Sequence, residues 1–314
     1  APEAATPAAP PAETAKEDSL PGKWVFTNQK ASFIPVLQYS ENRELRKELL
    51  LAYTKRANNG NEFDNNKNIS TIIKLRVKKA NLLGYASPAD FILDNTMAKN
   101  SKTVYDFLAT VWTPALAKAK LEAADLQKLM DSEGKGEKLE AWDWWFYAEK
   151  LRKAKYDLDE EALRPYFKLE NVRQGVFDLA SKLYGLKFKK LDNMPKYHAD
   201  VETFEVTDAD GSLIGILYTD YFPRPGKRAG AWMNNITEQY KKDGVNHRPI
   251  ICNVGNFTKP TSDKPSLLNM DEVETMFHEF GHALHGLLSQ CTYITVSGTN
   301  VARDFVELPS QIME

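Results

Sequence analysis

The spacing of apolar residues divides the chain into three stretches. From 23 to 199, apolar side chains recur at helical spacing, and the segments 41–60 and 65–84 each begin at polar residues and end at a glycine. Between 200 and 260 the period shortens, and VETFEV, TDADGS and LIGILYTDYF indicate strand, turn and strand. From 266 to 314 the helical period returns. We therefore expect a mainly α fold with a small β-sheet beside the last helices.

The segment LLNMDEVETMFHEFGHALHGLLSQ, residues 267–290, predicts one well-defined helix. Asn269 stands three residues before Glu272, which is typical of an N-terminal cap with a capping box. Apolar residues then recur at i, i+3, i+4 and i+7 as one stripe: Val273, Met276, Phe277, Phe280, Leu284, Leu287 and Leu288. At about 100° per residue, His278 and His282 lie opposite that stripe. The two histidines therefore face solvent or a cleft and not the core.

The chemistry of the two histidines favours a position in a cleft over one on a solvent-exposed face. Residues i and i+4 lie one helical turn apart, so the imidazoles of His278 and His282 can reach a single ion. Zinc accepts imidazole nitrogens, and a catalytic zinc keeps one of its four positions for water. Glu279, beside the first histidine, is placed to take a proton from that water. This is the H-E-x-x-H arrangement of zinc peptidases. His285 is not expected to be a ligand.

Two histidines need a third protein ligand, and NVARDFVELPSQIME supplies three carboxylates. They are Asp304, Glu307 and Glu314. We choose Glu307 as the ligand, on a second segment packed across the first helix. Asp304, one helical turn earlier, is a candidate for orienting a ligand imidazole, and for both residues a plain surface position is the alternative. Pro309 indicates that a helix begins or bends there.

Composition restricts the class of protein. With 314 residues, 42% hydrophobic and 27% charged, the chain is that of a globular protein with a sizeable core. A net charge of −2 from 41 basic and 43 acidic residues gives no case for nucleic acid, and no apolar run approaches the ~20 residues that cross a bilayer. Cys252 and Cys291 suit free thiols better than a disulfide framework. Residues 1–22, rich in Ala and Pro, predict a disordered tail.

MFHEFGHALH, followed by SGTNVARDFVELPSQIME, resembles the thimet-oligopeptidase family of zinc peptidases, and most closely its bacterial peptidyl-dipeptidases. AWDWWFYAEKLR, ILYTDYFPRPGKRAGAW and NFTKP also look like family segments, so the resemblance covers 23–314. It implies a multi-helix zincin-type catalytic domain whose channel admits short peptides. It also implies one Zn²⁺ per chain, held by His278, His282 and Glu307, with Glu279 as the general base.

The chain also departs from the family pattern. Family members carry a helical lobe ahead of GKWVF and a long segment after PSQIME, and the tyrosine and histidine that stabilise the oxyanion lie in that later segment. Loss of such donors typically costs ~10²–10³ in rate. We therefore expect an internal fragment of the full enzyme, for which the C-terminal part of the same enzyme is a partner.

These observations predict zinc-dependent hydrolysis of short peptides with release of C-terminal dipeptides. The alternatives are an oligopeptidase that releases longer pieces, or a fragment that binds metal or peptide without turnover. PIICNVGNF is either the edge strand that pairs with substrate or an ordinary strand, and Asp220, Arg224 and Lys227 suit a structural ion-pair cluster. We expect neither nucleic acid nor membrane as a partner. A cytoplasmic location is favoured, with the periplasm as the alternative.

Overall fold

A computed structural model describes residues 25–314 except 28, 135 and 158–159, so the predicted 1–22 tail lies outside the described residues. The chain forms two compact units. Among the described residues, the sheet unit comprises those within 25–31, 160–301 and 305–314, and the helical unit comprises those within 32–157 and 302–304. Each unit is described by itself.

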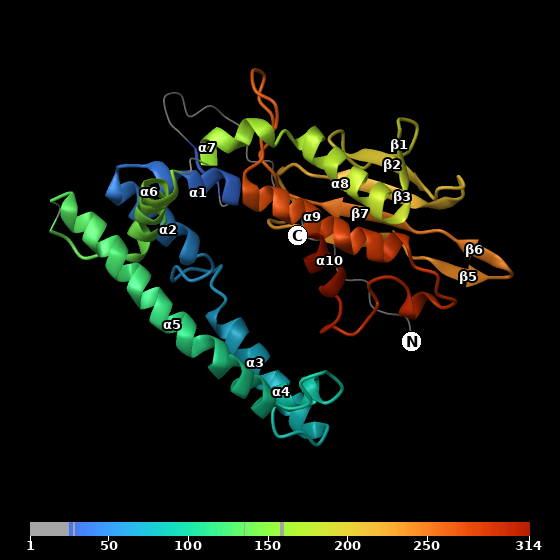
Figure 1. Cartoon of the computed structure of the whole chain (residues 1–314). Helices are drawn as coiled ribbons and strands as arrows, with labels where there is room; N and C mark the ends of the chain where they lie inside the picture. Colours follow the sequence, from blue (N-terminus) through green and yellow to red (C-terminus); the bar gives the residue numbers. More distant parts are fainter. Residues whose placement is uncertain (1–24, 28, 135, 158–159) are drawn as a thin grey trace. The chain divides into compact units, whose positions relative to one another are not determined.

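The described chain is mainly helical, as predicted (Figure 1). The helical unit contains nearly all of the first six helices, which are α1 (Lys30–Tyr39), α2 (Arg43–Thr54), α3 (Asn66–Leu82), α4 (Pro88–Leu93), α5 (Ser101–Ser132) and α6 (Trp144–Tyr156). The sheet unit contains α7 (Glu160–Leu163), α8 (Leu169–Tyr184), α9 (Met270–Leu287) and α10 (Leu308–Met313). No helix in the described part of the chain is long and apolar enough to cross a membrane.

The strands all lie in the sheet unit. They are β1 (Lys187–Leu191), β2 (Glu202–Thr207), β3 (Leu213–Asp220), β4 (Trp232–Thr237), β5 (Tyr240–Lys242), β6 (Val245–His247) and β7 (Ile250–Val254). Five strands form one sheet in the order β1-β2-β3-β7-β4, and β5 pairs with β6 alone. The turn between β2 and β3 is the predicted hairpin: Gly211 N donates to Asp208 O at 3.0 Å.

Two features of the sheet differ from the expectation. β7, from the segment PIICNVGNF, is parallel to β3 on one side and antiparallel to β4 on the other, so its backbone groups are already paired. The suggestion that it is the edge strand is therefore wrong: the edge strands are β1 and β4, and β4 is the edge next to β7. β1 lies inside the stretch expected to be helical. Its short alternating sequence, KFKKL, pairs with β2 along its whole length.

The main core lies between one face of the sheet and helices α8 and α9, which run beside each other across it (Figure 1). Phe280 of α9 is fully buried and packs near Phe177 of α8 and Phe188 of β1, with ring centroids 5.9 Å away in both pairs. The helix approaches the sheet closely at Gly286, where an added Cβ would lie 2.5 Å from Ile251 Cδ1. Close packing thus fixes α9 on the sheet.

The opposite face of the sheet holds a buried ion-pair cluster. Asp220, 2% exposed, accepts hydrogen bonds from Arg224 Nη1 at 2.7 Å and Lys227 Nζ at 2.9 Å, and Tyr197 Oη donates to it at 3.0 Å. Burial alone would raise the pKa of Asp220, but the bonds from Arg224 and Lys227 outweigh it and lower the pKa to about 2. The cluster ties the chain that leaves β3 back onto the strand, as a structural role requires.

The helical unit has a smaller core. Its apolar cluster is formed by residues of α5 and α6: Leu126, Met130, Phe146 and Tyr147. Beside it, the fully buried Asp143 accepts hydrogen bonds from Arg43 and from the buried Arg46, each with a 2.8 Å contact. The aromatic residues at the start of α6 are thus divided: Phe146 and Tyr147 lie in the core, whereas Trp144 and Trp145 are about 40% exposed.

Candidate active site

Helix α9 carries the H-E-x-x-H motif and starts as predicted. The Asn269 side chain accepts from Glu272 N at 2.8 Å, and the Glu272 carboxylate accepts from Asn269 N at 3.0 Å, which completes the capping box. The apolar stripe faces the core, with Phe277 and Leu288 partly buried at its margins. His278 and His282 lie off that stripe, with 23% and 12% of their side chains exposed. The cap and the stripe together fix how far the histidines are rotated away from the core.

The structure brings both predicted histidines together with the predicted carboxylate. Glu307 Oε2 lies 3.2 Å from His278 Nε2 and 3.1 Å from His282 Nε2, and all three atoms lie within 4.8 Å of one another. Donors of a tetrahedral zinc with bonds near 2.05 Å are spaced by roughly 3.3 Å. Two imidazole nitrogens and a carboxylate oxygen at this spacing fit one zinc ion, so the donor set suits the metal by both chemistry and distance.

Glu307 is held by the start of α10. It precedes Leu308 and Pro309, and the helix begins there because proline suits the first turn, as the sequence predicted. Ser310, fully buried, donates its hydroxyl to Glu307 O at 2.8 Å and to Glu307 Oε2 at 2.9 Å. The same hydroxyl thus ties both the backbone and the carboxylate of Glu307.

The two helices touch through backbone at Gly281. A Cβ built on Gly281 would lie 2.6 Å from Ser310 Cα and 2.7 Å from Pro309 O. Contacts that short are met only if the backbone itself moves, because neither partner is the end of a flexible side chain. Glycine at 281 is therefore what allows Glu307 to approach the histidines.

A second carboxylate orients His278. Glu314 Oε1 lies 2.5 Å from His278 Nδ1. If Nδ1 carries the proton and donates it to Glu314, the Nε2 lone pair is left free toward Glu307 and a metal. His282 Nδ1 is buried and has no partner among the described residues. Burial lowers the pKa of His282 despite the nearby Glu307 carboxylate, which favours the neutral imidazole that a metal needs.

Glu279 has the environment of a base. It is 9% exposed, and its Oε2 has no hydrogen-bond partner in the described part of the chain. Burial, reinforced by the Glu307 charge, raises the pKa of Glu279 to about 7, while His278 and a hydrogen bond from the Met233 backbone act in the opposite sense. A carboxylate with a pKa near neutrality can both accept and return a proton at physiological pH.

The remaining sequence candidates lie elsewhere. Asp304, suggested as a residue that orients a ligand, accepts a hydrogen bond from Met97 N at 2.6 Å, and no contact between it and His278 or His282 occurs among the described residues. His285 faces the ring of Phe305, with centroids 6.2 Å apart.

Sequence reasoning missed two contributors to the site. One is the pairing of Glu314 with His278, although its seven-residue spacing from Glu307 places the two carboxylates two helical turns apart. The other is the packing of Met233 and Asn235 of β4 beside Gly286 of α9, which no local pattern predicts because it depends on the strand order.

The fold and the donor set define a class of site: an H-E-x-x-H helix with a carboxylate from a following segment, the arrangement of zinc peptidases. Comparison with known proteins agrees. A family model described as peptidase family M3 matches residues 36–314. The chain is 40% identical over 304 residues to dipeptidyl carboxypeptidase of Salmonella typhimurium, covering 96% of this chain. It is 38% identical over 319 residues to oligopeptidase A of Escherichia coli, covering all of this chain.

The chain therefore belongs to peptidase family M3. It spans 44% of the length of the Salmonella protein and 46% of the length of the Escherichia coli protein.

Proposed function

We propose that this chain carries the metal-binding half of a zinc-dependent peptidase that hydrolyses short peptides and releases C-terminal dipeptides. One observation carries the proposal: a single carboxylate oxygen of Glu307 contacts both motif histidines, beside the buried Glu279. The names of the relatives, a dipeptidyl carboxypeptidase and an oligopeptidase, support peptide hydrolysis and fit either product length.

His278, His282 and Glu307 would hold the zinc ion, with Glu314 fixing the His278 tautomer. Polarisation of a carbonyl oxygen and acidification of water are the chemistry that zinc supplies when bound by such a set. Glu279 takes the proton from the attacking water and returns it to the amine that leaves. Its burial makes it basic enough for the first transfer and, once protonated, acidic enough for the second.

The edge strand β4 is the natural place for the peptide backbone. It is paired with β7 on one side only, so its other edge can accept an extended peptide by strand addition. The packing of β4 against α9 supports this placement: a Cβ built on Gly286 would lie 3.4 Å from Asn235 Oδ1 and 3.5 Å from Met233 Cε, so β4 runs beside the helix that carries the proposed base. A peptide paired with β4 would therefore pass the carboxylate.

Metal content and hydrolysis test the proposal. We expect one zinc per chain by native mass spectrometry, lost in His282→Ala and retained in Glu279→Gln. We expect Glu279→Gln to slow cleavage of a quenched fluorescent peptide ~10²–10⁴-fold, whereas Asp271→Asn, in the exposed first turn of α9, leaves the rate nearly unchanged.

Three outcomes would contradict parts of this proposal. Full zinc occupancy in His282→Ala would overturn the ligand set, and unchanged cleavage by Glu279→Gln would overturn the base. Zinc binding without turnover would favour the alternative of a metal-binding fragment. Mass spectrometry of the products separates dipeptide release from release of longer pieces, and amidation of the substrate C-terminus should suppress only the former.

A further inference from the structure

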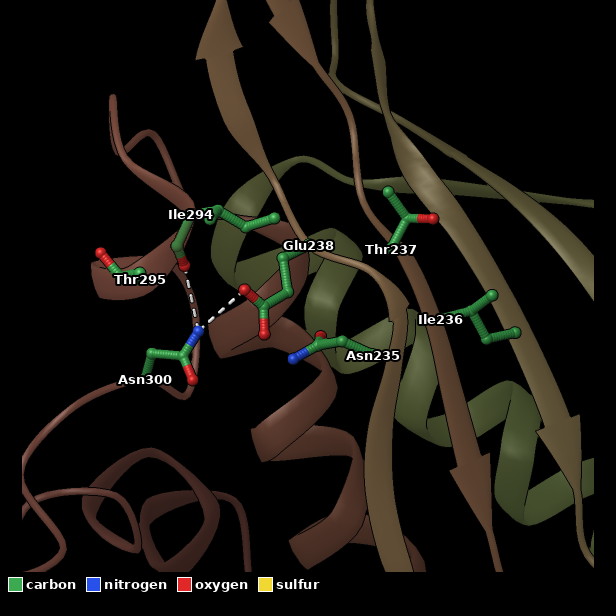
Figure 2. A pocket seen from close by; sticks show the side chains of 7 residues that line it. All are labelled: Asn235, Ile236, Thr237, Glu238, Ile294, Thr295 and Asn300. Carbon is green, nitrogen blue, oxygen red and sulfur yellow. Dashed lines mark hydrogen bonds between the residues drawn. The ribbon is translucent and has the colours of Figure 1, made fainter. Parts of the chain in front are cut away.

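A hollow of about 570 Å³ lies in the sheet unit where β4 ends (Figure 2). One side is formed by 235–238, the end of β4 and the residue after it. The other side is formed by Ile294, Thr295 and Asn300, from the segment that follows α9. None of the proposed metal ligands lines it, so it is separate from the metal centre.

Glu238 is the only charged residue among those that line the hollow. Its Oε2 accepts a hydrogen bond from Asn300 Nδ2 at 2.8 Å, and the same amide donates to Ile294 O at 3.0 Å (Figure 2). Within the described part of the chain, no basic side chain forms an ion pair with this carboxylate. The negative charge is therefore held in place by a neutral amide and is not neutralised.

Buried hydrogen bonds hold the two walls together behind Glu238. Gln239, 1% exposed, donates to Cys291 O at 2.9 Å and accepts from the hydroxyls of Ser289 and Ser297 at 3.0 and 3.2 Å. Ser289 in turn accepts from Gly298 N at 3.1 Å. The chain on both sides of the hollow is thus tied to one amide, so its shape does not depend on a ligand.

The hollow lies along the path that the proposed function gives the substrate. Met233 of β4 packs beside Gly286 of α9, the helix that carries Glu279, and Glu238 follows Met233 by five residues, at most about 17 Å along a strand. A register shift between Asn235 and Thr237 interrupts the regular pairing of β4 with β7 within the wall of the hollow, and β4 ends at Thr237. Bulges at sheet edges re-aim side chains and terminate pairing. A peptide that follows the edge would therefore leave the strand at the hollow.

We propose that this hollow is a substrate subsite that selects a positively charged group, with Glu238 as its specificity residue. The inference rests on the proposed function. When a dipeptide is released, only two residues follow the scissile bond, so the hollow can be reached only from the N-terminal side. The selected group belongs about five residues before the scissile bond, near the seventh residue from the peptide C-terminus.

The apolar neighbours of Glu238 suit such a group. Ile294, 45% exposed, lies beside Glu238 on the opposite wall (Figure 2), and Ile236, 53% exposed, lines the hollow farther along β4. Lysine and arginine lay their aliphatic stems along apolar surface and keep the charge at the tip, so Ile294 beside the Glu238 carboxylate forms a matching surface. A free N-terminal ammonium at the same position would meet the same carboxylate without using the isoleucines.

Peptide binding tests the subsite without relying on turnover. Calorimetric titrations would use the full chain with Glu279→Gln, loaded with zinc, and N-acetylated, otherwise uncharged peptides of about twelve residues in which one lysine is moved along the sequence. We expect one position to bind about five-fold more tightly than the uncharged peptide. In the same Glu279→Gln background, a second substitution, Glu238→Gln, should abolish that preference and leave the affinity for uncharged peptides unchanged. The new amide oxygen can still accept from Asn300. Glu205→Gln on β2 is the matched control and should change nothing.

The outcomes separate this inference from the function beneath it. A scan in which peptides bind but no lysine position is preferred, or a preference that survives Glu238→Gln, overturns the subsite and leaves the peptidase proposal standing. Failure of every peptide to bind overturns both. Shortened, non-acetylated peptides that place the α-amino group at the preferred position distinguish an N-terminal ammonium from a lysine side chain. Ile294→Ser should weaken binding of the lysine peptide and leave binding of the shortened peptide unchanged.

Discussion

The two units of the chain hold their helices in place by different means. In the sheet unit, α8 and α9 bury apolar faces against five paired strands, and the core is continuous from Leu169 to Met313. In the helical unit, a cluster of four buried apolar residues is joined to a buried aspartate between two arginines. Every donor of the candidate metal site comes from the sheet unit. A site that needs three ligand atoms held in a fixed geometry is carried by the unit with the larger buried core.

The difference is clearest in what each unit leaves exposed. Large apolar side chains of α3 and the first half of α5 lie open in the helical unit, among them Ile69, Ile73, Leu75, Tyr105, Phe107 and Trp112. Exposed apolar surface on this scale is typical of faces that contact another polypeptide segment. Regular helices therefore form in this unit without most of the burial that stabilises α9.

The largest expected effect is a cavity in the sheet unit. Phe280→Ala removes a fully buried ring between α8, α9 and β1, which should cost about 3–5 kcal/mol of unfolding free energy. Hydrogen exchange followed by mass spectrometry should show lost protection in α9 and β7 and little change in α2 and α6. Equal loss in both units would mean that the chain unfolds as one cooperative block and that the comparison is wrong.

Loss of the charge network should instead destabilise the helical unit and leave the sheet unit unchanged. Asp143→Asn keeps the shape of the side chain but leaves the buried Arg46 without its anion, at a cost of about 3 kcal/mol. Protection should fall in α2 and α6 while α9 is unaffected, as measured in the same exchange experiment. Glu137→Gln removes a more exposed partner of Arg43 and serves as the control, with a much smaller effect.

Acid should weaken the sheet unit through Asp220. Its pKa is about 2 in the folded chain and 3.8 ordinarily, so its stabilising contribution is present above about pH 4 and is lost as pH falls toward 2. We expect the difference in unfolding free energy between the wild type and Asp220→Asn to shrink by about 2 kcal/mol over that range. Urea titrations at several pH values measure it, and a difference that is constant with pH would show that Asp220 is not ionised against Arg224 and Lys227.

The smallest expected effect completes the comparison. Trp112→Gln replaces an aromatic residue that is 63% exposed on α5, and it should change unfolding free energy by less than about 0.5 kcal/mol. Paired with Phe280→Ala, it compares two aromatic residues on helices that differ mainly in burial. A loss of several kcal/mol would mean that the apolar face of α5 is buried in solution, and light scattering would then show whether a second copy covers it.

Sequence reasoning succeeded where a local pattern is sufficient. The cap at Asn269, the apolar stripe of α9 and the start of α10 at Pro309 depend on residues a few positions apart, and each was predicted. It was wrong about the place of β7, because strand order depends on pairing between segments more than thirty residues apart. Periodicity also predicted an apolar face on α3, but period alone does not say whether a partner covers that face.

In the candidate site, too, local features could be predicted from the sequence and long-range ones could not. The spacing of His278 and His282 is local and could be read directly, and Glu307 was chosen for its chemistry and distance along the chain. The choice among Asp304, Glu307 and Glu314 could not be made from spacing alone. The three carboxylates have different partners: Asp304 accepts from Met97 N, Glu307 contacts the Nε2 atoms of both histidines, and Glu314 contacts His278 Nδ1. These partners depend on how the chain folds back after residue 300.

The contact at Gly281 means that backbone atoms set the spacing between the parts of the candidate metal site. Side chains can adjust by rotating, but the gap between α9 and α10 is set where a glycine Cα meets the main chain of Pro309 and Ser310. Any larger residue at 281 would open that gap and withdraw the carboxylate, even with all three ligands intact. Gly281, which has no side chain and would touch no metal, thus sets the distance between the histidines and the carboxylate.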